Sequence, residues 1–348
     1  GQAGVSGITN GQGNSAMFFQ PQDVALDKSG NIYVADRDNH LIRRIDSSGN
    51  VTTVAGSGNS GYTDAKGTSA KFNKPTGVAL DNLGNVYVAD YNNHLIRKID
   101  SIGNVTTLAG IVGAQGLNNG PGSTAKFNYP TGVAVDSTGI VYVADSLNHL
   151  IRRIDSFGNV STLAGSGTSG STNGSDNIAK FNFPTGVAVD SSGNVYVADQ
   201  NNHLIRKIDS SGNVITFAGS GSSGSEDGKG SEASFNKAIG LAVDTSGNVY
   251  VADYNNHLIR KIDSSGNVIT VAGSGSLGSE NGEGTDATFN KPTGVAVDSF
   301  GNVYVSDFNN HVIRKLKGTS SSNSSDSSDN HTFQEIFRGD TQHTVTEG

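Results

Sequence analysis

The chain has no cysteine and no tryptophan, a single methionine and only six prolines in 348 residues. The absence of cysteine excludes disulfide bonds, thiolate metal sites and cysteine nucleophiles, but it does not decide the cellular compartment. No apolar run is long enough to span a membrane. Acidic residues outnumber Lys and Arg by 32 to 24, giving a formal net charge of −8. This charge argues against a surface that binds nucleic-acid phosphates.

A sequence repeat is the most prominent feature that the chain does contain. The string Asn-His-Leu-Ile-Arg, or a near copy, occurs six times, at steps of 54, 55, 54, 54 and 54 residues. The histidines of these strings are His40, His94, His149, His203, His257 and His311. A fixed period of this length is typical of a repeat architecture. Residues present in every copy are therefore assigned to the fold, and residues that differ between copies become candidates for ligand binding.

Each repeat contains four short segments rich in Val, Ile, Thr and Tyr. In the second repeat they are Pro75–Asp81, Asn85–Asp90, His94–Asp100 and Asn104–Gly110. This composition, bounded by Gly, Asn, Asp and Ser, predicts short strands joined by tight turns. The second strand is apolar on both sides, so both faces of each sheet need a cover. Six four-stranded antiparallel sheets arranged radially provide that cover, and we predict an all-β, six-bladed β-propeller around a central channel.

The strings Asp-Xaa-Xaa-Asn-His-Leu-Ile-Arg and Gly-Val-Ala-Val-Asp resemble the NHL repeat, which is named for Asn-His-Leu. The resemblance covers residues 16–317 and recurs six times. It implies a six-bladed propeller that usually serves as a binding or scaffolding module. Some relatives with similar propellers are lyases or lactonases that hold a metal at the central pore. The NHL domains of tripartite-motif proteins bind RNA through a basic surface.

We expect three parts along the chain: the propeller over residues 1–317, a flexible linker rich in Ser, Asn and Asp over 318–330, and a C-terminal tail over 331–348. The sixth copy stops after Lys317 without a fourth strand of its own. An unpaired strand edge is a liability for a folded protein. We therefore expect the tail to return as the closing strand of the last blade.

The polar residues that recur in every copy are expected to hold the blades together. Six histidines at one repeat position lie about one blade apart, too far to share a metal ion, so we assign them to turns and blade packing. The repeated Asp before each Asn-His and the repeated Arg after it predict an ion pair in each blade. The pairs are Asp36 with Arg43, Asp90 with Arg97, Asp145 with Arg152, Asp199 with Arg206, Asp253 with Arg260 and Asp307 with Arg314.

Variation between the copies points to a candidate binding surface. The loops after the second and fourth strands share one end of the propeller and carry most of the variation. The residue that follows the repeated Asp is Arg37, Tyr91, Ser146, Gln200, Tyr254 or Phe308. We interpret these six as a recognition ring around the pore, with neutral variation at exposed turns as the alternative. Asp23, where the other copies have Gly, is the one odd carboxylate that should point toward the pore end.

These observations favour a non-catalytic binding or scaffold propeller that presents its loop-bearing face to a protein, peptide or glycan. We expect no enzyme activity, because catalysis needs a unique group of converging residues. No cofactor or metal is expected, because the loop acids do not recur with the spacing that calcium requires. The alternative is a lyase- or lactonase-like enzyme with a metal in the channel, and RNA binding is least favoured.

Location and assembly are inferred from composition. A surface rich in Gly, Ser and Asn and low in charge favours an extracellular or cell-surface protein, with the cytoplasm still open. We expect a monomeric propeller or a domain of a larger protein.

Overall fold

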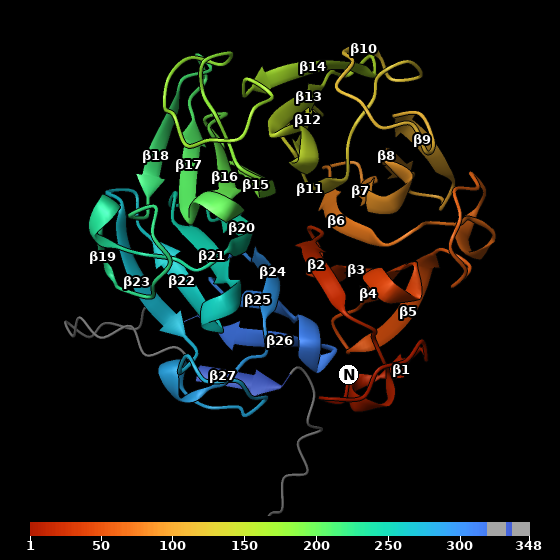
Figure 1. The fold of residues 1–348 in the computed structure, drawn as a ribbon. Helices are drawn as coiled ribbons and strands as arrows, with labels where there is room; N and C mark the ends of the chain where they lie inside the picture. Colours follow the sequence, from red (N-terminus) through yellow and green to blue (C-terminus); the bar gives the residue numbers. More distant parts are fainter. Residues whose placement is uncertain (319–331, 336–348) are drawn as a thin grey trace, which may run out of the picture.

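A computed structural model describes residues 1–318 and the strand at 332–335. Its strands form six sheets arranged around a central axis, which confirms the six-bladed β-propeller (Figure 1). Within each blade, consecutive strands are neighbours and run antiparallel from the channel outward. This arrangement is the meander that the turn sequences predict, because hairpin turns of four or five residues join only adjacent antiparallel strands.

The first and second strands of each blade form the inner part of the wheel. The first strands are β2 (Pro21–Leu26), β6 (Pro75–Leu80), β11 (Pro130–Val135), β15 (Pro184–Val189), β20 (Ala238–Val243) and β24 (Pro292–Val297). Each contacts the first strand of the next blade, and β24 contacts β2, so the ring closes. The second strands are β3 (Ile32–Asp36), β7 (Val86–Asp90), β12 (Val141–Asp145), β16 (Val195–Asp199), β21 (Val249–Asp253) and β25 (Val303–Asp307).

The third and fourth strands form the outer part. The third strands are β4 (Leu41–Ile45), β8 (Leu95–Ile99), β13 (Leu150–Ile154), β17 (Leu204–Ile208), β22 (Leu258–Ile262) and β26 (Val312–Lys317). The fourth strands are β5 (Asn50–Ala55), β9 (Val105–Ala109), β14 (Asn159–Ala164), β18 (Val214–Ala218), β23 (Asn267–Ala272) and β27 (Thr332–Glu335). Three two-residue strands extend the outer edge of blades 1, 3 and 5: β1 (Gly11–Gln12), β10 (Gly120–Pro121) and β19 (Gly228–Lys229).

Short 3-10 helices follow the second strands. They are η2 (Arg37–Asn39), η4 (Tyr91–Asn93), η5 (Ser146–Asn148), η6 (Gln200–Asn202), η8 (Tyr254–Asn256) and η10 (Phe308–Asn310). Each ends at the repeated His, whose φ of 56–61° lies in the left-handed region. The predicted third segment began at this His, but the strand begins one residue later, because a left-handed residue cannot continue a strand. Four more 3-10 helices lie in the long loops: η1 (Gly13–Ser15), η3 (Gly67–Ser69), η7 (Gly230–Glu232) and η9 (Gly284–Asp286).

The outer strand of blade 6 comes from the C-terminal tail. Strand β27 pairs antiparallel with β26, and Thr332 lies opposite Lys317. The remainder of the predicted tail, and the predicted linker apart from Gly318, lie outside the described residues. Blade 6 also contacts the N-terminal segment, where the backbone N–H of Gly4 donates to Asn310 O at 2.9 Å.

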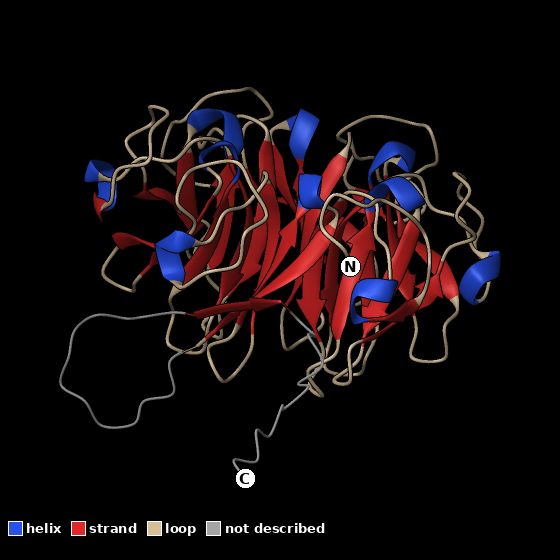
Figure 2. Ribbon diagram, turned by 90° about the horizontal axis from the view of Figure 1, so that it is seen from below, coloured by secondary structure: helices blue, strands red, loops and turns tan. Residues whose placement is uncertain are grey.

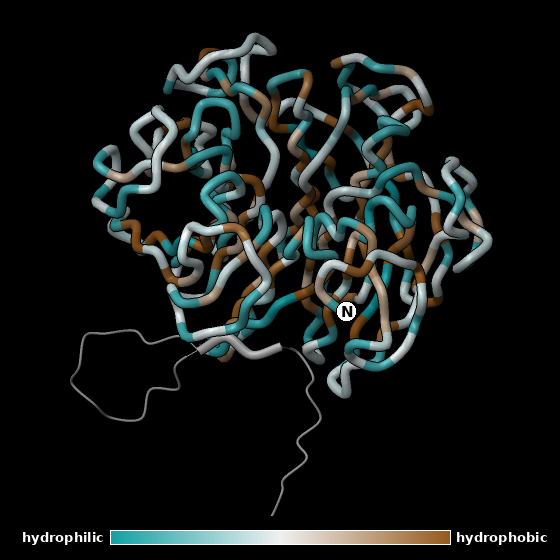
Figure 3. Tube along the Cα trace, turned by 60° about the horizontal axis from the view of Figure 1, so that its bottom comes forward, coloured by the Kyte–Doolittle hydropathy of each residue, from teal (hydrophilic) through white to brown (hydrophobic). Residues whose placement is uncertain are grey.

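The hydrophobic core lies between neighbouring blades. One cluster joins Tyr87 and Ile96 of blade 2 to Phe127 and Val143 of blade 3, and every interface has an equivalent cluster. Figure 3 shows hydrophobic segments mainly in the interior of the wheel and hydrophilic segments mainly at its surface. A blade therefore buries its faces only against two neighbours, which explains why the repeats close into a ring.

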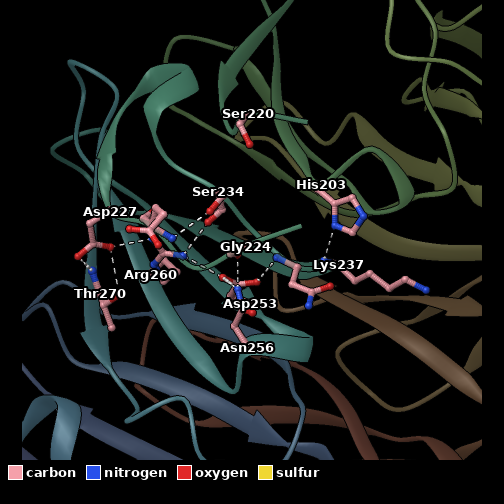
Figure 4. A network of polar contacts seen from close by, with 12 residues as sticks. His203, Ser220, Gly224, Asp227, Ser234, Lys237, Asp253, Asn256, Arg260 and Thr270 are labelled. Atoms are coloured by element: carbon pink, nitrogen blue, oxygen red, sulfur yellow. Dashed lines mark hydrogen bonds and ion pairs between the residues drawn. The ribbon is translucent and has the colours of Figure 1, made fainter. Parts of the chain in front are cut away.

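A buried ion pair ties the second strand of each blade to the third. The six pairs of repeated Asp and Arg have N–O distances of 2.7–2.9 Å, and both partners are buried. In blade 5, Asp253 Oδ2 also accepts from Asn256 Nδ2, and Asp253 Oδ1 accepts from the backbone N–H of Asn236 (Figure 4). The carboxylate is thus surrounded by donors, as a buried charge requires.

The terminal nitrogens of each guanidinium donate to the preceding long loop, whereas Nε of Arg260 has no hydrogen-bond partner within the described part of the chain. Arg260 donates to the carbonyl oxygens of Ser234 and Glu226 and to Asp227 Oδ1 (Figure 4). It also lies over the ring of Phe235, 5.2 Å from the ring centroid. The loop is therefore fastened to the blade through the same side chain that pairs with the aspartate.

The repeated His links each blade to the next. His203 Nδ1 accepts the backbone N–H of Lys237, at the entrance of the following blade (Figure 4). The same bond occurs at all six interfaces, and His311 to Gln20 closes the ring over a separation of 291 residues. Burial lowers the pKa of all six histidines and so favours the neutral ring. The backbone N–H that points at Nδ1 then assigns the remaining proton to Nε2.

Substituting Asp199 by Ala should destabilise the propeller strongly, because it leaves the guanidinium of Arg206 buried without its counter-ion. We expect a loss of about 3–5 kcal/mol, measured by urea unfolding followed by circular dichroism. The control is Asp209→Ala, which removes an exposed carboxylate that accepts hydrogen bonds only within its own turn. Equal shifts in the two unfolding midpoints would contradict the role assigned to the pair.

Candidate binding site

The two ends of the propeller differ in the kind of connection that they carry. The loops after the second strands, with their 3-10 helices, cluster at one end, and short turns occupy the other (Figure 2). The long loops after the fourth strands begin at the first end and continue along the outer side of the wheel, where the N–H of Gly230 donates to Gly266 O in a short turn. We call these ends the loop face and the turn face. On the turn face each turn is held by an Asp, as where Asp190 Oδ1 accepts the backbone N–H groups of Ser192 and Asn194. Most of the variation between repeats lies on the loop face.

The six residues of the predicted ring occupy the first position of the 3-10 helices that follow the second strands. Arg37, Tyr91 and Gln200 line one cavity of about 170 Å³ at the loop-face mouth of the channel. The other three do not line it. Ser146 is fully buried and its hydroxyl donates to Pro184 O at 2.6 Å, while Phe308 is 8 % exposed. The ring thus divides into residues that open on the cavity and residues that pack against their neighbours.

Tyr254 and Phe308 both lie beneath cationic side chains. Lys291 Nζ is 5.1 Å from the centroid of the Tyr254 ring, and the guanidinium carbon of Arg37 is 5.7 Å from that of Phe308. These contacts bring the aromatic members of the ring into the packing of the loop face.

A second ring of variable residues surrounds the first and was missed by the sequence analysis. These are the residues before the first strand of each blade: Gln20, Lys74, Tyr129, Phe183, Lys237 and Lys291. All have a left-handed φ between 51° and 59°, and their N–H groups bond the repeated His. The signal in the sequence is variation just before an otherwise constant strand. Phe183 reaches the cavity wall.

The channel narrows where the first strands approach one another closely. Thr76 Oγ1 donates to Thr131 O, and Thr131 Oγ1 donates to Thr185 O, both at 2.9 Å. Glycine is required beside these carbonyls, since a Cβ on Gly186 would lie 2.2 Å from Ile239 O. Five blades have Gly at this position, and the sixth has Asp23.

Asp23 lies on the cavity wall, at the narrow part of the channel. Its Oδ2 accepts the backbone N–H of Val78 in the next blade at 3.0 Å. The residue lines both the upper cavity and the lower part of the channel, so it lies deeper than Arg37, which lines only the upper cavity. Burial raises the pKa of the Asp23 carboxyl to about 7, although hydrogen bonds from the backbone oppose that rise.

One position in the long loops is apolar in three consecutive repeats and serine in the other three, a difference that the sequence analysis also missed. In every long loop a Gly accepts a hydrogen bond from the repeated Asn, which fixes the backbone there. The next residue is Ile8, Tyr62 or Leu117 in the loops that enter blades 1, 2 and 3, with exposed fractions of 50, 59 and 59 %. At the same position the other three loops have serine: Ser171, Ser225 and Ser279.

Two further observations concern the whole described chain. Within residues 1–318 and 332–335, no three His, Asp or Glu side chains form a group that could hold a metal ion. None of the helices in these ranges is long and apolar enough to cross a membrane.

A scan of the chain against protein families finds the NHL repeat at residues 18–45, 72–99, 127–154, 181–208, 235–262 and 289–316. Each match runs from the loop phenylalanine to the end of the third strand. The chain belongs to the NHL-repeat family. Each matched range contains the repeated Asp, Asn, His and Arg that form the buried network and the blade-to-blade bonds.

The NHL propeller is similar to parts of larger proteins. It is 33 % identical over 285 residues to Protein SUPPRESSOR OF QUENCHING 1, chloroplastic, from Arabidopsis thaliana, covering 76 % of this chain and 27 % of that protein. It is 31 % identical over 342 residues to NHL repeat-containing protein 2 from Gallus gallus, covering 87 % of this chain and 47 % of that protein. The chain thus spans less than half of either relative.

Among solved structures, the NHL propeller resembles a protein of unknown function from Bacteroides thetaiotaomicron. The TM-score is 0.68 at 26 % identity, over 90 % of this chain and 73 % of the other. The likeness supports the six-bladed architecture.

Asp23→Asn should change the way in which stability depends on pH. The folded-state pKa of Asp23 lies above its unfolded value, so between about pH 4 and pH 7 the folded protein binds more protons. As the pH rises from about 4 to about 7, the free energy of unfolding of the wild type should therefore fall relative to that of Asp23→Asn. Urea unfolding at a series of pH values measures the difference.

Asp209→Asn provides a control in which the expected change of stability with pH is opposite. Hydrogen bonds from Asn213 lower the pKa of Asp209, so its carboxylate stabilises the fold above the unfolded pKa and this contribution is lost on acidification. If Asp23→Asn followed the same trend as Asp209→Asn, the raised pKa of Asp23 would be wrong.

Proposed function

We propose that this NHL propeller is a non-catalytic binding module that docks a protein or peptide on its loop face. The observation that carries the proposal is the exposed apolar side chains of Ile8, Tyr62 and Leu117. They occupy one repeat position in three consecutive loops, whereas the remaining loops have serine there. The serine-bearing repeats form the same blades, so the fold does not need these apolar side chains. Ile178 and Leu277 are also exposed, at 58 and 63 %, in the loops that enter blades 4 and 6, but at other repeat positions. Exposed apolar groups that share one position in three adjacent loops of a rigid scaffold favour a protein contact.

The charge distribution of the long loops adds a second asymmetry and suggests the character of the partner. The six long loops span residues 1–20, 56–74, 110–129, 165–183, 219–237 and 273–291, and contain eight acidic residues. Six of the eight lie in the loops that enter blades 5 and 6: Glu226, Asp227, Glu232, Glu280, Glu283 and Asp286. A partner that places apolar side chains over Tyr62 and basic side chains over these acids would match the surface.

We favour binding over a lyase- or lactonase-like activity for a reason of geometry. Catalysis needs a nucleophile or base, an orienting group and a charge stabiliser that converge on one point. The repeated Asp, Arg and His side chains are engaged in the network that holds the blades. The charged residues that line the upper cavity are Asp23 and Arg37.

The proposal predicts that the triple variant Ile8→Ser, Tyr62→Ser, Leu117→Ser loses binding while keeping its fold, because serine is the natural residue at the matching positions. Peptides selected by phage display on the wild-type protein provide the probe, and fluorescence polarisation measures their Kd. We expect the variant to bind at least about tenfold more weakly, a change of about 1.4 kcal/mol.

The chain offers a matched control on the opposite face. Leu83, Phe157 and Phe300 occupy turns of the turn face and are 79, 89 and 82 % exposed. The triple substitution of these residues by serine removes as much exposed apolar surface, yet it should leave the Kd unchanged. A loss confined to this control would place the docking surface on the turn face and refute the proposal.

A further inference from the structure

Blade 1 departs from the other five where its strands face the channel. Its first strand begins Pro21-Gln22-Asp23, whereas four blades have Pro-Thr-Gly and blade 5 has Ala-Ile-Gly. It also supplies Arg37, the one charged member of the six-residue recognition ring predicted from the sequence. Gln22, Asp23 and Arg37 all line the same cavity of about 170 Å³. The charged departures from the repeat thus meet in one place.

Arg37 and Asp23 lie at different depths and do not pair with each other. Arg37 begins η2 on the loop face, and its side chain is 23 % exposed. Its guanidinium lies over the Phe308 ring, and its polar contacts in the described part of the chain are long, at 3.4 Å to Gln20 Oε1 and 3.5 Å to Asp38 Oδ1. The flat, forked guanidinium is suited to donate two hydrogen bonds to a ligand carboxylate in place of these contacts.

In its ionised form, which a nearby ammonium group would favour, Asp23 supplies the complementary charge below. One of its oxygens accepts the backbone N–H of Val78, and the carboxylate lies where the channel narrows. A carboxylate in this position favours a ligand that brings hydrogen-bond donors or a positive charge. The amides of Gln22 and Gln200 and the rings of Tyr91 and Phe183 complete a wall that is partly polar and partly aromatic.

We propose that this cavity binds a small zwitterion of amino-acid size, with its carboxylate at Arg37 and its ammonium group at Asp23. A dry cavity of about 150 Å³ accommodates benzene, so the volume suits a ligand of this size. A ligand with a single charge would cover one of the two charged residues without compensating it, which costs free energy. The exposed residues Ile8, Tyr62 and Leu117, here called the loop rim, do not line the cavity. The cavity site therefore does not depend on docking at the loop rim.

The test uses glycine, L-alanine, L-leucine and L-phenylalanine as probes at millimolar concentration, with isothermal titration calorimetry as the measurement. We expect at least one of them to bind the wild-type protein. Its methyl ester, which lacks the negative charge, and its N-acetyl form, which lacks the positive charge, should each bind at least about tenfold more weakly.

Two variants copied from the sibling repeats locate the site. Arg37→Gln introduces the residue that blade 4 has at Gln200, and Asp23→Gly introduces the residue of the other five blades. Each should weaken binding of the zwitterion at least about tenfold. Thermal melting of the unliganded variants shows whether they are folded. Peptides selected on the wild-type protein whose binding depends on Ile8, Tyr62 and Leu117 should bind these variants as they bind the wild type.

Three results would overturn the proposal: no binding by any of the four amino acids, unchanged affinity in both folded variants, or equal affinity for the free amino acid and its methyl ester. Retained peptide binding in the same variants would show that the rim still functions. Failure of the cavity and failure of the proposed function are therefore distinguished.

Discussion

The buried ion pair between Asp and Arg is the interaction on which the rest of each blade depends. Two charges removed from water are tolerated only when additional hydrogen bonds surround the pair. In blade 5 that requirement brings together the second strand through Asp253, the third strand through Arg260, the 3-10 helix through Asn256, and the long loop through its carbonyl groups. One pair of charges therefore fixes four parts of the repeat that the hydrophobic core alone would leave free to shift.

Neighbouring blades are joined by a hydrogen bond from a backbone N–H to the repeated histidine, which explains why the histidine is constant. The left-handed backbone at His203 ends the 3-10 helix, and the ring then accepts the N–H of Lys237 at the start of the next blade. The N–H belongs to the backbone, so the side chain of Lys237 is free to vary. A constant histidine can therefore bond to a position whose side chain varies between repeats. The imidazole, a common catalytic group in other proteins, has a structural role here because its Nδ1 is occupied by this bond.

The largest departures from the repeat lie at side chains that the network does not use, whereas the loop residue that accepts from the repeated Arg varies only between Asn, as at Asn173, and Asp, as at Asp227. The side chains of Ile8, Tyr62 and Leu117 project from a backbone already fixed by the preceding glycine, so changing them alters the surface without altering the blade. Asp23 is different in kind, since it replaces a glycine at the crowded centre of the wheel. Its carboxylate is accommodated by accepting the N–H of Val78, a contact to the next blade for which a glycine has no side chain.

The sequence by itself determined the number of blades, the order of the strands and the pairing of Asp with Arg, because all three follow from a repeat read along one chain. It also indicated that the loop face would carry the variation. Only the tertiary structure decided that Ser146 and Phe308 are buried while Arg37, Tyr91 and Gln200 share a cavity. It likewise decided that Asp23 and Arg37 line one wall at different depths. The physical reason is that six equivalent positions look alike in sequence, whereas their exposure depends on the side chains of neighbouring blades, which are distant in the chain and adjacent in space.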